Sequence, residues 1–341
     1  MADREPQAYE LVIDEAHDGH TLRSVLQSEL KFSRRLVRNL KLRDGVLVNG
    51  QPARLKSVVH KGDKIHITLP DEETHIEAEP MDLDIRYEDD EVVVVNKPPG
   101  MLSHPSSKER TGTLLGGLTA YLAPAGQVPH AVHRLDRDTS GVILYAKHSH
   151  AHHLFDRALR SGWMHRTYCA VVYHKEAFVP LRMGEWQTID LPIAPDPNTP
   201  TRRVVAAGGQ RAVTHYQALA STDQISVVQI VLETGRTHQI RVHFAAVDMP
   251  LVGDRAYGGP VWRRAERDPA AAPLLAFPRQ ALHALQLMWK HPVTGEVKRV
   301  TAPPPEDMRT FWREAGGDPR VWDRLMADPS AVPPGWRFDL A

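Results

Sequence analysis

The charge of this 341-residue chain changes sign abruptly near Pro70, and this change predicts separate folded units. Residues 21–66 hold eleven Lys and Arg against three Asp and Glu, a net charge of +8. Residues 70–91 hold eleven Asp and Glu against Arg86 alone, a net charge of −10. A basic unit beside an acidic connector predicts a polyanionic partner at the N-terminal end, although a solvated charged face has the same composition.

Composition excludes several classes of protein. At roughly 150 residues per domain, the length predicts about two domains. A chain that is 42% hydrophobic and 25% charged is neither disordered nor fibrous. No apolar run approaches the roughly 18 residues of a membrane helix, and residues 1–10 lack the apolar segment of a signal peptide. The single Cys169 excludes a disulfide framework within the chain and a multi-cysteine metal site, so we expect a cytoplasmic protein.

The basic unit reads as two helices followed by a hairpin. Thr21 is suited to cap a helix over residues 21–30, and Ser33 a second helix over residues 34–44. Asn49-Gly50 predicts a tight hairpin turn, and residues 65–69 a closing strand. The four basic residues of the second helix that share or adjoin one outer face are Arg34, Arg35, Arg38 and Lys41.

This order of elements, over residues 10–69, resembles the S4 RNA-binding domain. The resemblance implies that RNA is the polyanionic partner and that the basic face of the second helix contacts its phosphates. Such contacts give affinity without reading sequence. The acidic stretch that follows is then most simply a linker.

The remainder of the chain carries three segments suited to chemistry. A buried strand over residues 92–96 ends at Lys97-Pro98-Pro99-Gly100, which forces a loop. Residues 133–141, HRLDRDTSG, place two carboxylates among two arginines just before a strand over residues 142–146. Asp, Thr, Ser and Gly are common in plain turns, yet ordered loops hold many catalytic groups. Residues 232–243 predict a strand, a turn at Gly235 and a helix.

The motifs NKPPG (96–100), HRLDRDTSG (133–141) and GRTHQIRVH (235–243) together resemble the RluA family of pseudouridine synthases. Its members often carry an N-terminal S4 domain. The resemblance implies an α+β fold, with a small S4-like module of the αL type before a catalytic domain with a mainly antiparallel mixed sheet and flanking helices. We expect an N-terminal tail (1–9), the S4-like domain (10–69), an acidic linker (70–85), the catalytic domain (86–315) and a C-terminal tail (316–341).

The resemblance also implies a site. Asp136 matches the essential catalytic carboxylate, Tyr168 a tyrosine that stacks on the flipped base, and Arg236 the basic residue that pairs with the catalytic Asp. Arg134 matches an arginine that enters the RNA stack where the uridine leaves, and Ile240 an aliphatic residue that lines the pocket.

The implied reaction cuts the C1′–N1 bond of uridine, turns the uracil and rejoins it through C5. Since all atoms are conserved, we expect no cofactor and no metal, and the chain has no P-loop or HExxH motif. Asp136 acts either as nucleophile at C1′ or as base at C2′, and the sequence leaves both routes open. The expected substrate is large-subunit ribosomal RNA, because S4-bearing relatives commonly act there, with transfer RNA as the alternative.

Two rival functions fit parts of the same pattern. A non-catalytic RNA-binding or ribosome-assembly factor would retain RNA binding when Asp136 is replaced, and would have no activity to lose. A hydrolytic N-glycosidase would release free uracil, whereas isomerisation leaves the RNA mass unchanged. We expect no membrane partner, and the sequence leaves the oligomeric state open.

Overall fold

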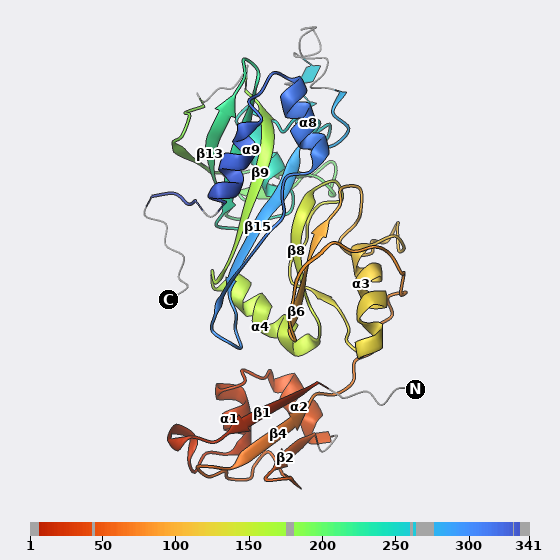
Figure 1. Ribbon diagram of the computed structural model, residues 1–341, viewed down its shortest axis with the longest axis vertical. Coiled ribbons are helices and arrows are strands. Elements are labelled where there is room, and N and C mark those ends of the chain that lie inside the picture. Colours follow the sequence, from red (N-terminus) through yellow and green to blue (C-terminus); the bar gives the residue numbers. More distant parts are fainter. Residues whose placement is uncertain are drawn as a thin grey trace.

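The computed structural model describes residues 7–42, 45–174, 181–259, 262–263, 276–329 and 331–334. Two units stack end to end, a small N-terminal unit and a larger unit built on one long sheet (Figure 1). Helices and strands combine as an α+β architecture. None of the described helices has the length and apolar character needed to cross a membrane.

The N-terminal unit packs two helices against a four-stranded antiparallel sheet. Its elements are β1 (Ala8–Val12), η1 (Glu15–His17), α1 (Leu22–Ser28), α2 (Arg34–Leu42), β2 (Val46–Val48), β3 (Gln51–Pro52) and β4 (Lys64–Thr68). The strands lie in the order β1-β4-β2-β3. The Thr21 and Ser33 hydroxyls cap α1 and α2 by accepting hydrogen bonds from backbone N–H groups three residues on. Asn49 and Gly50 take the positive φ angles of a tight hairpin turn, 51° and 80°. The predicted helices and hairpin are therefore confirmed.

The two units are packed against each other. Tyr9 of β1 donates its hydroxyl proton to Glu91 of the larger unit at 2.7 Å. The Phe32 ring lies with its centroid 4.4 Å from that of the His150 imidazole, and Tyr9 contacts the same imidazole at 5.6 Å. Because Phe32, Glu91 and His150 are all buried, this contact excludes water.

The acidic connector is bound along the larger unit; we call residues 70–84 the acidic strap. The Glu72 carboxylate lies 2.7 Å from Nε2 of His130. Both carboxylate oxygens of Glu79 accept hydrogen bonds from the Gly112 N–H, at 3.0 and 2.9 Å, and the Glu79 N–H donates to the Gly116 carbonyl at 3.1 Å. A Cβ on Gly116 would overlap the Glu79 carboxylate, so a larger residue there would displace this side chain.

The larger unit is built on one mixed sheet. Its strands are β5 (Ile85–Glu88), β6 (Val92–Lys97), β7 (His130–Ala131), β8 (Ser140–Ala146), β9 (Met164–Tyr173), β10 (Trp186–Asp190), β13 (Val213–Ser221), β14 (Ile225–Leu232), β15 (Leu282–Lys290) and β16 (Val297–Thr301). The main path runs β10-β13-β14-β9-β15-β8-β6-β5, with β16 beside β15 and β7 beside β8. Among the described strand pairs of this sheet, β15 and β8 are parallel and the others antiparallel, which confirms the predicted mainly antiparallel mixed sheet. A separate pair joins β11 (Ile193–Pro195) to β12 (Arg203–Val205).

Helices cover the two faces of this sheet. They are α3 (Leu114–Leu122), η2 (Ala123–Ala125), α4 (Ser149–Arg160), α5 (Gln239–Ala246), α8 (Glu306–Glu314) and α9 (Arg320–Ala327). In Figure 1, α8 and α9 lie in front of β9 and β15. Along β9, Cys169 and Val171 face the core shared with Trp312 and Trp322 of these helices. Because side chains alternate along a strand, Tyr168 belongs to the core of the opposite face, where α5 packs.

The C-terminal helix extends the larger unit beyond the boundary expected at residue 315. Val321, Trp322 and Leu325 of α9 are buried in one core with Met308 of α8. The connecting turn is fixed by a hydrogen bond of 3.0 Å from the Trp312 indole N–H to the backbone carbonyl of Asp318. The segment read as a tail therefore begins with a packed amphipathic helix.

Gly141, where the HRLDRDTSG loop enters β8, has a strong conformational requirement. Its φ angle is +112°, and a Cβ there would overlap the backbone of Ala284 on β15. We expect Gly141→Ala to lower the free energy of unfolding by about 3 kcal/mol or more, because backbone strain and overpacking combine. Urea titration with an unchanged m-value would measure this loss. Gly295→Ala, at φ +73° in open space, is the control with an expected cost of about 1 kcal/mol. Equal losses in the two variants would contradict the explanation.

Candidate active site

Asp136 lies on a loop whose backbone is held by two buried cations. The Lys97 ammonium donates to the carbonyl of Arg137 at 2.8 Å. The Arg279 guanidinium donates to the carbonyl of Asp138 at 3.0 Å. Both cations come from distant parts of the chain, so tertiary contacts fix the two residues that follow Asp136.

Lys97 uses all three of its N–H donors, one of them on the Asp136 loop. Its side chain is fully buried, and it also donates to the carbonyls of Pro98 and Met101, at 2.9 and 2.8 Å. Burial lowers the pKa of the Lys97 ammonium to about 7, against the opposing effect of the Asp138 and Asp136 charges. The NKPPG segment therefore contacts the Asp136 loop through the Lys97 ammonium.

The Asp136 carboxylate has one paired oxygen and one open oxygen. Arg241 of α5 donates from Nη1 to Oδ2 of Asp136 at 3.0 Å. The same guanidinium is held by the buried Asp254 through two bonds of 2.7 and 2.9 Å. Nε2 of His238 lies 3.8 Å from Oδ1. The Asp136 side chain is 24% exposed, so a substrate can reach the carboxylate.

Tyr168 and Arg166 project from one face of β9, because they are two residues apart. Tyr168 lies opposite Ala284, and Ala284 opposite Gly141, so the tyrosine is two strands from the end of the Asp136 loop. Burial raises the pKa of the Tyr168 hydroxyl; Arg166 opposes the rise and the Asp136 charge adds to it. Tyr168 is therefore a neutral phenol beside the carboxylate, and its ring is suited to stack on a base.

The sequence and the fold of this chain are similar to those of known proteins. Residues 91–246 match the family described as RNA pseudouridylate synthase, and residues 9–65 match the RluD ribosomal pseudouridine synthase N-terminal domain. The chain is 40% identical over 310 residues to the uncharacterized RNA pseudouridine synthase YhcT of Bacillus subtilis (strain 168), which covers 89% of this chain and 96% of the relative. The chain belongs to the RNA pseudouridylate synthase family.

Other similar proteins support this family assignment. This synthase is 39% identical over 282 residues to the ribosomal large subunit pseudouridine synthase D of Salmonella typhimurium, covering 81% of this chain and 84% of that protein. The structure of human RNA pseudouridylate synthase domain containing 4 superposes with a TM-score of 0.54 at 24% identity, covering 69% of this chain and 93% of that chain. The latter likeness concerns the fold. The protein is thus an enzyme, a pseudouridine synthase.

The synthase brings some of the predicted residues together. Asp136 and Tyr168 lie in one site, as described above. Arg134 is exposed on the same loop, two residues before Asp136. Ile240 is buried in the main core, next to Arg241 on α5. The roles of Arg134 toward RNA and of Ile240 toward the base remain predictions.

The structure corrects the expected partner of Asp136. Arg236 is exposed in the turn before α5, and its Nε donates to the backbone carbonyl of Arg211 at 3.1 Å. Arg241, five residues later in the same motif, makes the ion pair instead. The reason is the start of α5 at Gln239, which places Arg236 outside the helix and Arg241 on its inner side.

Several site residues carried signals that sequence reasoning did not use. Lys97 lies in NKPPG, and His238 and Arg241 lie in GRTHQIRVH, yet no chemistry was assigned to them. Asp254 and Tyr257 stand in the short segments Gly253-Asp254 and Tyr257-Gly258. The sequence does not show that these residues lie close to Asp136 in the folded protein.

The basic residues predicted to contact RNA lie on α2 of the N-terminal unit. Arg34, Arg35 and Arg38 are exposed there. The Lys41 side chain lies outside the described residues. The three described arginines therefore form an accessible positive face, as the pattern predicts.

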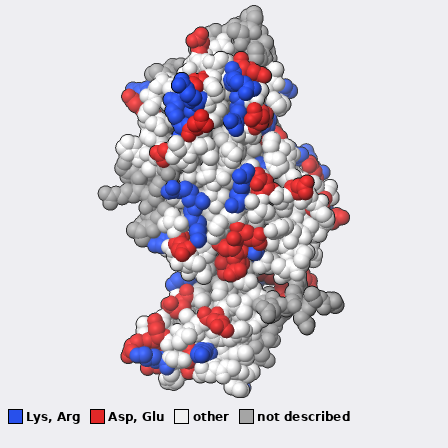
Figure 2. All heavy atoms as spheres, in the orientation of Figure 1, with Lys and Arg blue, Asp and Glu red and all other residues white. Residues whose placement is uncertain are grey.

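The face that carries α8 and α9 is less suited to a polyanion. Figure 2 shows acidic and basic side chains interspersed on it. Its exposed arginines are Arg309, Arg313, Arg320 and Arg324. Acidic residues of the same helices and their turn lie among them, at Glu306, Asp318 and Asp323. This view thus shows no continuous basic surface over the described residues.

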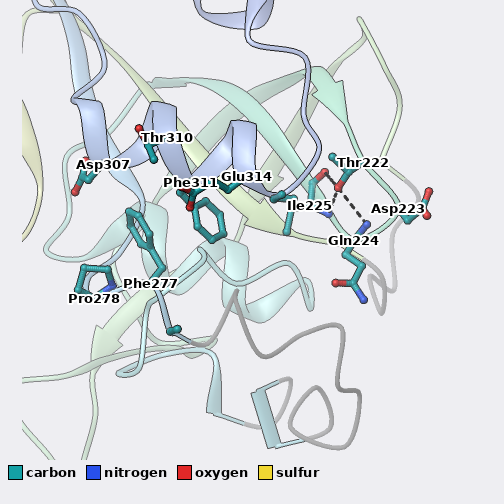
Figure 3. Close-up of a pocket in the computed structure, with 12 residues that line it drawn as sticks. Thr222, Asp223, Gln224, Ile225, Phe277, Pro278, Asp307, Thr310, Phe311 and Glu314 are labelled. Atoms are coloured by element: carbon teal, nitrogen blue, oxygen red, sulfur yellow. Dashed lines mark hydrogen bonds between the residues drawn. The ribbon is translucent and has the colours of Figure 1, made fainter.

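A hollow of about 590 Å³ lies on that side, between α8 and the turn that joins β13 to β14 (Figure 3). Asp223, Asp307 and Glu314 line it together with Phe277 and Phe311, so it does not suit a phosphate. It belongs to the face of the sheet opposite to Tyr168. In the described part of the chain, no group of three or more His, Cys, Asp or Glu could hold a metal ion.

Proposed function

We propose that this synthase isomerises uridine in large-subunit ribosomal RNA, with Asp136 as the reacting carboxylate. The observation that carries the proposal is the ion pair of Arg241 with Oδ2 of Asp136, a carboxylate whose side chain is still 24% exposed. The relatives named ribosomal large subunit pseudouridine synthase D support the choice of RNA. Transfer RNA is the alternative substrate.

The proposed reaction needs an ionised carboxylate and a closed place for the base. Arg241 stabilises the negative charge on Asp136 through Oδ2. In one route Oδ1 bonds to C1′ as N1 leaves, and this bond breaks again when C5 attacks C1′. In the other route Oδ1 removes the C2′ proton as N1 leaves, and returns it to C2′ when C5 bonds to C1′. The C1′–N1 bond breaks, the uracil turns, and C5 bonds to C1′. The C5 proton is then lost while N1 gains one, so the atoms balance. The detached uracil must stay shielded from water during the turn.

A uridine within a helix cannot reach Asp136, so the base has to leave the stack. We propose that the Tyr168 ring holds the flipped base, and that Ile240 contributes apolar surface beside it. Arg134 is exposed two residues before Asp136 and fits the role of filling the vacated place in the RNA. Arg236, also exposed, would then contact RNA phosphates rather than Asp136.

The N-terminal unit is proposed to be an S4-like RNA-binding domain. Its two helices and antiparallel sheet support this, as does the exposed positive face of α2. We propose that this domain spans residues 10–69 after a short tail, that residues 70–85 are the linker, and that the catalytic domain runs from residue 86 through α9. The cytoplasmic location expected from the single Cys169 is part of this proposal.

Charge reversal on α2 is expected to weaken RNA binding. The double variant Arg34→Glu with Arg38→Glu should raise the Kd for ribosomal RNA at least about tenfold and reduce the salt dependence of binding, because phosphate contacts are lost. Arg309→Glu on α8 is the matched control and should leave Kd within about twofold. Filter binding at several salt concentrations measures both. Equal effects of the two changes would contradict a specific role for α2.

Tritium release from RNA labelled at uracil C5 tests the function as a whole. Formation of the C5–C1′ bond expels that hydrogen, so we expect release from large-subunit ribosomal RNA transcripts or particles and none from transfer RNA transcripts. Release from transfer RNA alone would overturn the proposed substrate. Free uracil with an abasic site would indicate an N-glycosidase, and binding without release from any RNA or particle would indicate an assembly factor.

A further inference from the structure

We propose that His238 is a positioning residue for Asp136, with its Nε2–H directed at the reacting oxygen Oδ1 by Tyr257. This inference rests on the proposed role of Asp136 as the reacting carboxylate. It begins from the 3.8 Å distance between Nε2 and Oδ1, on the side of Asp136 that Arg241 leaves open.

The hydrogen bonds of Tyr257 favour one tautomer of His238. The Tyr257 hydroxyl accepts from the backbone N–H of Arg203 at 3.1 Å and lies 2.5 Å from Nδ1 of His238. A phenol has one proton to donate, and Nδ1 is the one acceptor that contacts it among the described residues. Tyr257 therefore donates to Nδ1, and the imidazole proton resides on Nε2, which faces Asp136.

The backbone of His238 supports a functional reading. Its φ angle of 57° is left-handed, a conformation in which a residue other than Gly or Asn is costly, by about 1–3 kcal/mol. The residue precedes α5 and gives that helix no side-chain cap. Asn or Gly would also form this turn, and a histidine here is consistent with a role for its imidazole.

The charges around His238 favour its neutral form. Burial lowers its pKa, the Asp136 charge opposes this, Arg241 and Arg203 lower it further, and Asp254 opposes them. At neutral pH the imidazole is therefore a neutral Nε2–H donor. Protonation at lower pH would add a proton at Nδ1, where Tyr257 already donates, and would disrupt the arrangement.

The arrangement orients both oxygens of Asp136. Arg241 holds Oδ2 at 3.0 Å, and the Nε2–H lies less than 1 Å beyond hydrogen-bond distance from Oδ1. A small closure on RNA binding completes that bond and fixes the plane of the carboxylate against the ribose. His238 thus acts through Asp136 rather than on the substrate.

Three variants separate positioning from folding. His238→Asn tolerates the left-handed backbone and can still meet Tyr257, but it has no donor at the Nε2 position. His238→Gln places an amide N–H near that position. Tyr257→Phe leaves residue 238 untouched and keeps the ring that lies 4.9 Å from the Arg241 guanidinium, while removing the bond that sets the tautomer.

The experiment measures kcat and KM for tritium release on an RNA that the wild-type enzyme modifies. If the wild-type enzyme released no tritium from any RNA, the proposed function would be rejected, and not the role of His238. We expect His238→Asn to lower kcat about 10²-fold with KM within twofold, the size of effect that misplacement by about 1 Å produces. His238→Gln should recover at least tenfold of this loss, and Tyr257→Phe should lower kcat about tenfold. A kcat for His238→Asn within twofold of wild type, or equal losses in Asn and Gln variants, would overturn the proposal.

The pH profile gives a second readout that a purely structural role would not change. In the wild type, kcat should fall as His238 becomes protonated at acid pH. The titratable and charged groups that face His238 are Asp136, Asp254, Arg241, Arg203 and Tyr257. In His238→Asn this acid limb should move to lower pH, because no imidazole titrates. An acid limb unchanged in position would overturn the proposal even if kcat had fallen.

Discussion

Asp136→Asn is expected to reduce tritium release at least about 10³-fold while leaving the affinity for RNA within about twofold. The amide has nearly the shape of the carboxylate, so the Lys97 and Arg279 contacts to the loop backbone are kept. What is lost is the anionic oxygen that attacks C1′ or removes the C2′ proton. Single-turnover release and filter binding on the same labelled RNA measure the two quantities.

Asp138→Asn is the matched control for this change. Asp138 follows two residues later on the same loop, and its contact with Arg279 is made by the backbone carbonyl, which the substitution retains. We expect its rate to stay within about fivefold of wild type. If Asp138→Asn lost as much activity as Asp136→Asn, the assignment of the chemistry to Asp136 alone would be wrong.

Replacement of Arg241 is expected to have the second-largest effect, on both rate and stability. Arg241→Gln removes the cation shared by Asp136 and the buried Asp254. Breaking a buried pair from one side costs about 3–5 kcal/mol, so the free energy of unfolding should fall by that amount. We expect kcat to fall at least about 10²-fold, because Asp136 loses the contact that orients it.

The comparison with Arg236→Gln decides between the two arginines of the GRTHQIRVH motif. Arg236 is exposed and makes its contact with a backbone carbonyl, so its replacement should leave stability within about 0.5 kcal/mol. Tritium release and urea titration of both variants, side by side, test this. A larger loss of kcat in Arg236→Gln than in Arg241→Gln would restore the pairing expected from the sequence.

The sequence predicted the elements well where the signals are local. Thr21, Ser33 and the Asn49-Gly50 turn each specify their element through neighbours within three residues, and the structure confirms all three. The charged loop before a buried strand drew attention to residues 133–141, and the resemblance to the RluA family singled out Asp136 within it. Such inferences require no knowledge of distant residues.

The partner of Asp136 could not be predicted in the same way. The start of α5 decides which arginine faces inward, and it is set by the Gln239 side chain, which accepts from the Arg236 N–H at 3.0 Å and from the Thr234 hydroxyl at 2.8 Å. The supports of the loop are more distant still, since Arg279 lies 141 residues beyond the carbonyl that it holds.

The bound acidic strap changes how the two units would select an RNA. A free linker would let the N-terminal unit explore a volume, and its contribution would be an effective concentration. Here Glu72 and Glu79 fix the strap, and Tyr9 and Phe32 seat the unit against the catalytic domain. These contacts fix the distance between the N-terminal unit and the active site. If the N-terminal unit binds RNA as proposed, we expect the enzyme to favour RNAs in which the bound element and the target uridine are separated by this fixed distance.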